Sequence, residues 1–84
     1  MSFQKITYGD IAIQQQIETW AKDSNLDFDP EEHISMLIED KFGITTATIV
    51  SAQPGKGFIV LTIMADIWRE PREFALLKEG GLAW

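Results

Sequence analysis

Residues 44–65, ITTATIVSAQPGKGFIVLTIMA, decide the fold. Both halves of this stretch are rich in β-branched residues, which favour strands, and the QPGKG between them has the proline and glycines typical of a turn. Residues 44–52 and 58–65 are therefore predicted to pair as an antiparallel hairpin. Pro54 and Gly55 fit the two central positions of a type II turn, which needs glycine at its second central residue.

The second predicted strand has apolar side chains on both faces. Its residues alternate between a face with Phe58, Val60 and Met64 and a face with Ile59, Leu61 and Ile63. A hairpin alone is marginally stable in water, and a strand that is apolar on both faces is usually covered on both. The sequence therefore predicts that this pair needs a third strand, helices packed on it, or a second subunit.

Two helices are predicted before the hairpin, the first over residues 10–23. Four apolar residues fall on one face of this helix: Ile13, Ile17, Trp20 and Ala21. Either Thr7 or Asp10 is placed to cap its start, because a side-chain oxygen there can accept a hydrogen bond from a free backbone amide. The helix thus has one side that needs to be buried.

The second helix is predicted over residues 30–42 by similar spacing, in Ile34, Leu37, Ile38 and Phe42. Asp29 is placed to cap it, Pro30 suits the first helical position, and Glu32 three residues after the cap completes a capping box. Gly43 is placed to end the helix in a left-handed conformation.

The two ends of the chain complete the predicted architecture. Residues 2–8, SFQKITY, are the remaining candidate for a strand, and residues 69–81, REPREFALLKEGG, are predicted as a third helix. In that helix Phe74 and Leu77 point inward, and Gly80 ends it. The resulting order, β-α-α-β-β-α, predicts a single α+β domain that spans the chain, with the hairpin packed on helices.

Composition limits the possible functions. The 84 residues include 13 acidic and 7 basic side chains, so the formal net charge is −6, and there is no cysteine. The chain therefore has no disulfide, thiol nucleophile or thiolate ligand. Its negative charge disfavours direct binding to nucleic acid or to anionic membranes and favours a basic protein partner. The N-terminus has no apolar leader and no apolar run is long enough to span a bilayer, so the cytoplasm is the expected compartment.

The segment DSNLDFDPEEH, residues 23–33, has the carboxylate spacing of an EF-hand calcium loop. Two requirements fail: Phe28 stands where that loop needs glycine, and Ile34 where it needs a bidentate glutamate. His33 is the only histidine, whereas a zinc site needs three or four ligands. The sequence therefore predicts no metal site, no cofactor and no catalytic residue, and it favours a binding protein over an enzyme.

Acidic side chains gather between residues 23 and 40 beyond what a helix start requires. This range contains no lysine or arginine, and its carboxylates are Asp23, Asp27, Asp29, Glu31, Glu32, Glu39 and Asp40. A block of one sign predicts a docking surface for a basic protein groove, in which carboxylates stand in for nucleic acid phosphates. The alternative is a solvated loop with a helix cap. In size and charge the chain is similar to small acidic phage proteins that inhibit host nucleases and polymerases, a likeness of composition without a shared motif.

A second predicted contact surface lies in the C-terminal segment. Large aromatic side chains gather there with two arginines among them, a composition typical of interface anchors: Trp68, Arg69, Arg72, Phe74 and Trp84. They predict a structural or assembly subunit that forms a homodimer, either through this segment or through the strand with two apolar faces. In the alternative interpretation, the tryptophans close a small core.

Overall fold

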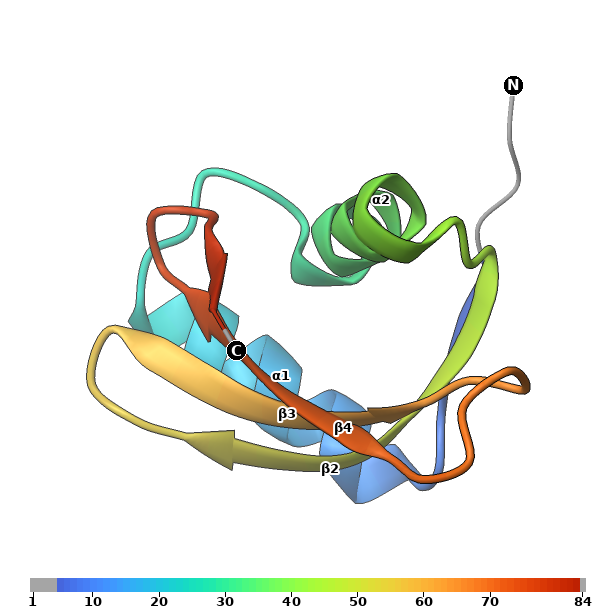
Figure 1. Cartoon of the computed structure of the whole chain (residues 1–84). Coiled ribbons are helices and arrows are strands. Elements are labelled where there is room, and N and C mark those ends of the chain that lie inside the picture. Colours follow the sequence, from blue (N-terminus) through green and yellow to red (C-terminus); the bar gives the residue numbers. More distant parts are fainter. Residues whose placement is uncertain (1–4, 84) are drawn as a thin grey trace.

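The computed structural model describes residues 5–83, which form an α+β domain of two helices and a mixed five-stranded sheet (Figure 1). The elements in chain order are β1 (Lys5–Tyr8), α1 (Ile11–Asp23), α2 (Pro30–Phe42), β2 (Thr46–Pro54), β3 (Phe58–Met64), β4 (Arg72–Leu77) and β5 (Leu82–Ala83). The strands lie in the sheet in the same order, β1-β2-β3-β4-β5. β1 is parallel to β2 and all other neighbours are antiparallel. The predicted N-terminal strand is confirmed at its second half, and residues 2–4 lie outside the described range.

The predicted hairpin is confirmed as β2 and β3, with Ala52 opposite Leu61. The register shifts by one residue at Val50, so β2 contains a bulge there. The prediction of a type II turn centred on Pro54 and Gly55 is wrong. The positive φ of 77° lies at Gly57, so the chain reverses two residues later than expected.

The prediction of a third helix over residues 69–81 is wrong, because residues 72–77 form β4. In this strand Phe74 and Leu76 are buried and Leu77 lies on the opposite face. A strand pairs with the free edge of β3, and this pairing outweighs the helical spacing of the segment. The chain then turns at Gly80, where φ is 102°, into the short strand β5.

The two helices predicted before the hairpin are confirmed, with Asp10 and Asp29 as their N-caps. The predicted capping box is wrong, because within the described residues the Glu32 side chain makes no hydrogen bond to the backbone of Asp29. The backbone N–H of Ala12 donates to Asp10 Oδ1 at 2.6 Å, and that of Glu31 donates to Asp29 Oδ1 at 3.1 Å. Gly43 ends α2 in the left-handed conformation, with φ at 70°. Within residues 5–83, neither helix is long and apolar enough to cross a membrane.

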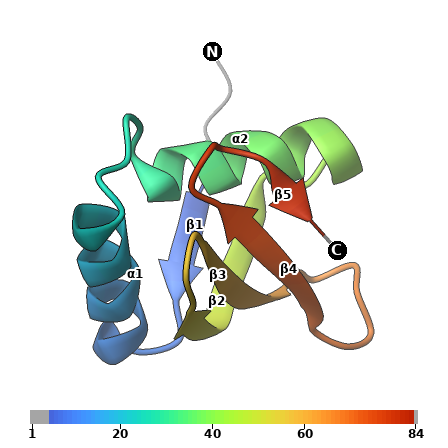
Figure 2. The same ribbon diagram turned by 90° about the vertical axis from the view of Figure 1, so that its left-hand side faces the viewer.

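The core lies between the two helices and one face of the sheet. Figure 2 shows α2 lying across the end of the strands and α1 running beside β1, with the two helices crosswise. The side chains most deeply buried come from both layers: Ile17, Ile34, Ile38, Ile49, Ile59, Leu61, Ile63 and Leu76. On β3 every second residue belongs to this set, so the helices cover a single face of the sheet.

The other face of the sheet is covered by neither α1 nor α2. Val50 and Phe58 are 41% and 38% exposed there, and Val60 is half-buried between Gln53 and Ala75 of the neighbouring strands. The expectation that both faces of the second hairpin strand are covered is therefore not met within residues 5–83.

Candidate functional site

Five of the seven predicted acidic residues form an exposed series along the loop before α2 and along α2 itself. We call them the acidic surface: Asp27, Asp29, Glu31, Glu32 and Asp40. The first two lie in the loop, the next two in the first turn of α2, and the last in its final turn. Glu39, predicted with them, is half-buried and its Oε2 is shielded from solvent, so it presents less of its charge.

Two members of the acidic surface have a structural role. Asp29 caps α2, and Glu31 Oε2 accepts a hydrogen bond of 3.0 Å from the Tyr8 hydroxyl. Within the described residues the side chains of Asp27, Glu32 and Asp40 make no hydrogen bond or ion pair. Helix capping and internal hydrogen bonding therefore account for only part of this surface.

The pKa of the Tyr8 hydroxyl responds to the negative charges beside α2. Burial of the side chain raises its pKa above the ordinary value, and the hydrogen bond to Glu31 raises it further. The charges of Glu31, Asp29 and Glu18 add to the shift in the same direction. Glu18 lies on α1 and was not among the predicted site residues. The packing of α1 brings Glu18 close enough to Tyr8 to affect its pKa. No residue near Glu18 in the sequence indicates this role.

Asp23 is separated from the acidic surface although it is close in sequence. It is the last residue of α1 and lines a cleft that also contains Lys56 and Lys78. Its carboxylate thus lies in mixed charge surroundings. The acidic cluster of the sequence is split in the fold, with Asp23 on one side and the rest around α2.

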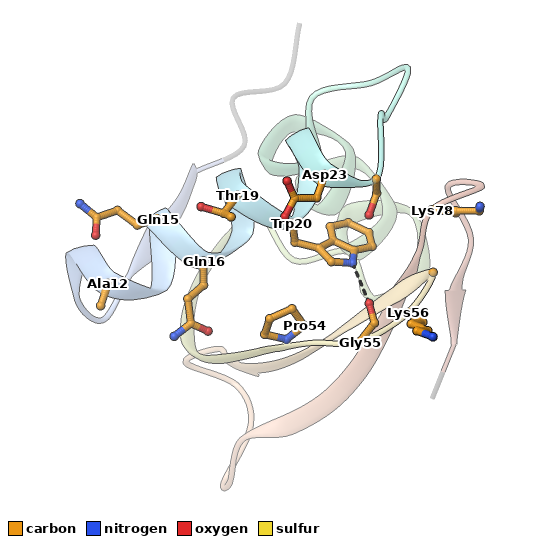
Figure 3. A pocket seen from close by; sticks show the side chains of 12 residues that line it. Ala12, Gln15, Gln16, Thr19, Trp20, Asp23, Pro54, Gly55, Lys56 and Lys78 are labelled. Carbon is orange, nitrogen blue, oxygen red and sulfur yellow. Dashed lines mark hydrogen bonds between the residues drawn. The ribbon is translucent and has the colours of Figure 1, made fainter.

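The cleft at Asp23 lies between α1 and the turn that joins β2 to β3 (Figure 3). Its volume is about 750 Å³, and it is lined by Ala12, Gln15, Gln16, Thr19, Trp20, Asp23, Ser24, Pro54, Gly55, Lys56, Gly57 and Lys78. The indole N–H of Trp20 donates to Gly55 O at 3.3 Å and holds the turn against the helix. The sequence predicts Lys56 only as part of the turn between the two strands and not as a site residue.

The predicted aromatic contact residues divide between the core and the undescribed end. Trp68 is 8% exposed and packs on Phe42 and Phe74, with ring centroids 5.3 Å and 6.0 Å away. The guanidinium carbon of Arg72 lies 4.8 Å from the Trp68 ring centroid. Trp68 therefore closes the core and offers little surface to a partner. Trp84 lies outside the described residues, so its predicted role stays a prediction.

His33 connects α2 to the turn between β4 and β5. Its Nε2 lies 2.7 Å from Gly80 O, within hydrogen-bond distance, and its ring packs on Phe28 with the centroids 4.3 Å apart. These contacts give the histidine a structural role. Within residues 5–83, no three side chains of His, Cys, Asp or Glu are arranged to hold a metal ion.

Comparison with known proteins supplies no relative for this chain. No family model, curated protein or solved structure matches it. The acidic surface and the cleft are thus interpreted from their own geometry and charge.

Proposed function

We propose that the chain is a non-enzymatic binding protein whose acidic surface docks on a basic protein surface. The proposal is carried by the exposed carboxylates of Asp27, Glu32 and Asp40, which make no hydrogen bond or ion pair within the described residues. A like-charged surface without internal partners costs self-repulsion, and a basic partner removes that cost.

The geometry of α2 suits a compact basic patch. Glu32 and Asp40 are eight residues apart, which is about 12 Å along a helix. Met36 lies between them on the same face and is 47% exposed, so it adds an apolar contact to the two charges. Duplex DNA presents one negative charge per roughly 1.7 Å of its axis. The acidic surface is sparser, so it fits a few lysines or arginines of a nucleic-acid-binding groove better than a whole duplex footprint.

The strength expected of such docking is modest and depends on salt. Each exposed ion pair contributes about 0.2–1 kcal/mol, and screening acts over about 10 Å at 0.1 M ionic strength. The charges therefore contribute mostly to the association rate and to partner choice. A partner held by them is captured at low salt and lost at high salt.

Neutralising the outward carboxylates tests the proposal. The triple variant Asp27→Asn, Glu32→Gln, Asp40→Asn keeps the Asp29 cap and the Tyr8–Glu31 hydrogen bond. A matched control removes three exposed carboxylates elsewhere, at Asp66, Glu70 and Glu79, so both variants have the same net charge.

The measurement is affinity capture of basic proteins from a lysate at low and high salt, with circular dichroism as the folding check. The partner captured by the wild type is expected to bind the control and not the triple variant at low salt. Equal capture by the two variants contradicts docking through this surface.

Homo-oligomerisation through the open face of the sheet is the second candidate function. It is favoured by Val50 and Phe58, which are exposed on an apolar face that neither helix covers. Light scattering over a concentration series is then expected to show a dimer that Val60→Lys converts to a monomer. A wild type that stays monomeric throughout excludes this candidate.

A further inference from the structure

The cleft between α1 and the β2–β3 turn is a site distinct from the acidic surface. We propose that it binds a small sugar phosphate, with the phosphate at the lysines and the sugar hydroxyls against α1. Its volume of about 750 Å³ lies in the range of about 300–1,000 Å³ of small-molecule sites. Three other hollows on the molecule measure 290, 270 and 270 Å³.

The lysines give this cleft its attraction for a phosphate. Lys56 lies in the hairpin turn and Lys78 follows β4, and a hydrogen bond of 3.0 Å from the Lys78 N–H to Gly57 O joins the turn to the end of β4. Both residues line the cleft and have exposed side chains, and the Lys78 amine points outward from Trp20 and Asp23 in Figure 3. Two of the seven basic residues of a chain with net charge −6 thus meet at one hollow. A phosphate bound there gains charge-assisted hydrogen bonds.

The helix wall of the cleft suits the hydroxyl groups of a sugar. Gln15, Gln16 and Thr19 line it with amide and hydroxyl groups, which both donate and accept hydrogen bonds. Trp20 is 5% exposed, and its indole N–H is already bonded to Gly55 O. So little of the ring is accessible that a nucleobase cannot stack on it. The body of the ligand is therefore a hydroxylated ring that hydrogen-bonds rather than an aromatic one that stacks.

Asp23 makes the cleft selective among anions. Its carboxylate accepts hydrogen bonds and donates none, so it favours sugar hydroxyls and repels the negative charge of a phosphate group. The lysines attract the phosphate and Asp23 requires hydroxyl groups. A sugar phosphate satisfies both, whereas inorganic phosphate or a neutral sugar satisfies only one.

The walls of the cleft are in place before a ligand arrives. The Trp20–Gly55 hydrogen bond joins the helix to the turn, and the Lys78–Gly57 hydrogen bond joins that turn to the end of β4. Both bonds to the turn use its backbone, so replacement of the Lys56 or Lys78 side chain leaves them intact. A pre-formed site loses less entropy on binding.

The test is a titration of the ¹⁵N-labelled protein at low salt with glucose 6-phosphate, glucose and inorganic phosphate in turn. Glucose 6-phosphate is expected to shift the amide signals of Gly55, Gly57 and Lys78 more strongly than either other probe. Lys56→Gln and Lys78→Gln are each expected to weaken its binding up to about fivefold, the value of an exposed ion pair of about 1 kcal/mol. Arg69→Gln, which removes an exposed charge from another turn, is the control and leaves binding unchanged.

Asp23→Asn gives the decisive comparison because it acts in opposite directions on two probes. It is expected to weaken the binding of glucose 6-phosphate, because the sugar loses a hydrogen-bond acceptor. It is expected to strengthen the binding of inorganic phosphate, because a repulsive negative charge is removed. Strengthening of both probes overturns the sugar assignment and leaves only attraction of anions. Absence of shifts at the cleft amides with all three probes at millimolar concentration overturns the site itself.

Discussion

Tyr8 offers a direct test of the electrostatics beside α2, because it is the only tyrosine of the chain. Its hydroxyl donates to Glu31 Oε2 at 3.0 Å, and its ordinary pKa is 10.0. Burial first, then the hydrogen bond and charge of Glu31, and then Asp29 and Glu18 raise the pKa in the folded state. Tyrosinate formation is therefore expected well above pH 10 in the folded protein.

The raised pKa makes stability depend on pH with a definite sign. The folded state keeps its phenol proton while the unfolded chain loses it, so this contribution to stability is complete below pH 10 and is lost as pH rises above it. From the linkage relation the loss between pH 10 and pH 11 is at most about 1 kcal/mol, and solvent screening of the carboxylates reduces it. Tyr8→Phe removes the hydroxyl. It costs about 0.5–1.5 kcal/mol at neutral pH for the lost hydrogen bond, and it abolishes this part of the alkaline loss.

The assay is the absorbance of tyrosinate near 295 nm as a function of pH, with far-ultraviolet circular dichroism recorded in parallel. Glu31→Gln is expected to lower the Tyr8 pKa toward its ordinary value, and added salt to lower it less, because burial does not respond to screening. The matched control is Glu79→Gln, an exposed carboxylate that does not contribute to the Tyr8 shift, and it leaves the pKa unchanged. Titration of Tyr8 at its ordinary pKa, while the circular dichroism stays native, would refute the convergence of carboxylates at this hydroxyl.

Two further predictions concern the fold, and both are measured by urea unfolding. Leu76→Ala is expected to lower the free energy of unfolding by about 2–5 kcal/mol, because Leu76 is 0% exposed. Leu77→Ala on the open face is expected to cost less, and the reverse order contradicts β4 as a strand. Gly43→Ala is expected to cost about 1–2 kcal/mol from backbone strain at φ 70° alone, since no atom lies within 4 Å of the added methyl group; an unchanged midpoint contradicts the left-handed helix end.

The helices could be predicted from the sequence because their signals are local. Asp10, Asp29 and Gly43 act within one turn of their own positions, and the structure places all three as caps. Strand β4 could not be predicted, because its six residues fit the helical period and the strand period equally well. Phe74 and Leu77 have helical spacing, Phe74 and Leu76 have strand spacing, and only the free edge of β3 decides between them.

The candidate sites could be predicted only where neighbours in sequence are neighbours in space. Asp27, Glu32 and Asp40 share a loop and a helix, so their grouping follows from the sequence. Lys56 and Lys78 come together only through the pairing of β3 with β4, which the predicted third helix excluded. Long-range pairing of strands thus limits how much of a site can be predicted from a single chain.

The two proposed sites lie on different elements, and this makes their tests independent: α1 and the β2–β3 turn line the cleft, whereas α2 and the loop before it carry the acidic surface. The cleft residues Ala12, Gln16 and Thr19 lie on one flank of α1, four and then three residues apart, as the helical repeat requires. Ile17 faces the core, and Glu18, about 100° further around the helix, contributes to the field at Tyr8. Because the cleft and the acidic surface share no residue, neutralising the acidic surface is expected to leave sugar phosphate binding unchanged apart from a salt-dependent charge effect. If one variant with an intact fold lost both partner capture and sugar phosphate binding, the acidic surface and the cleft would be a single binding surface and not two.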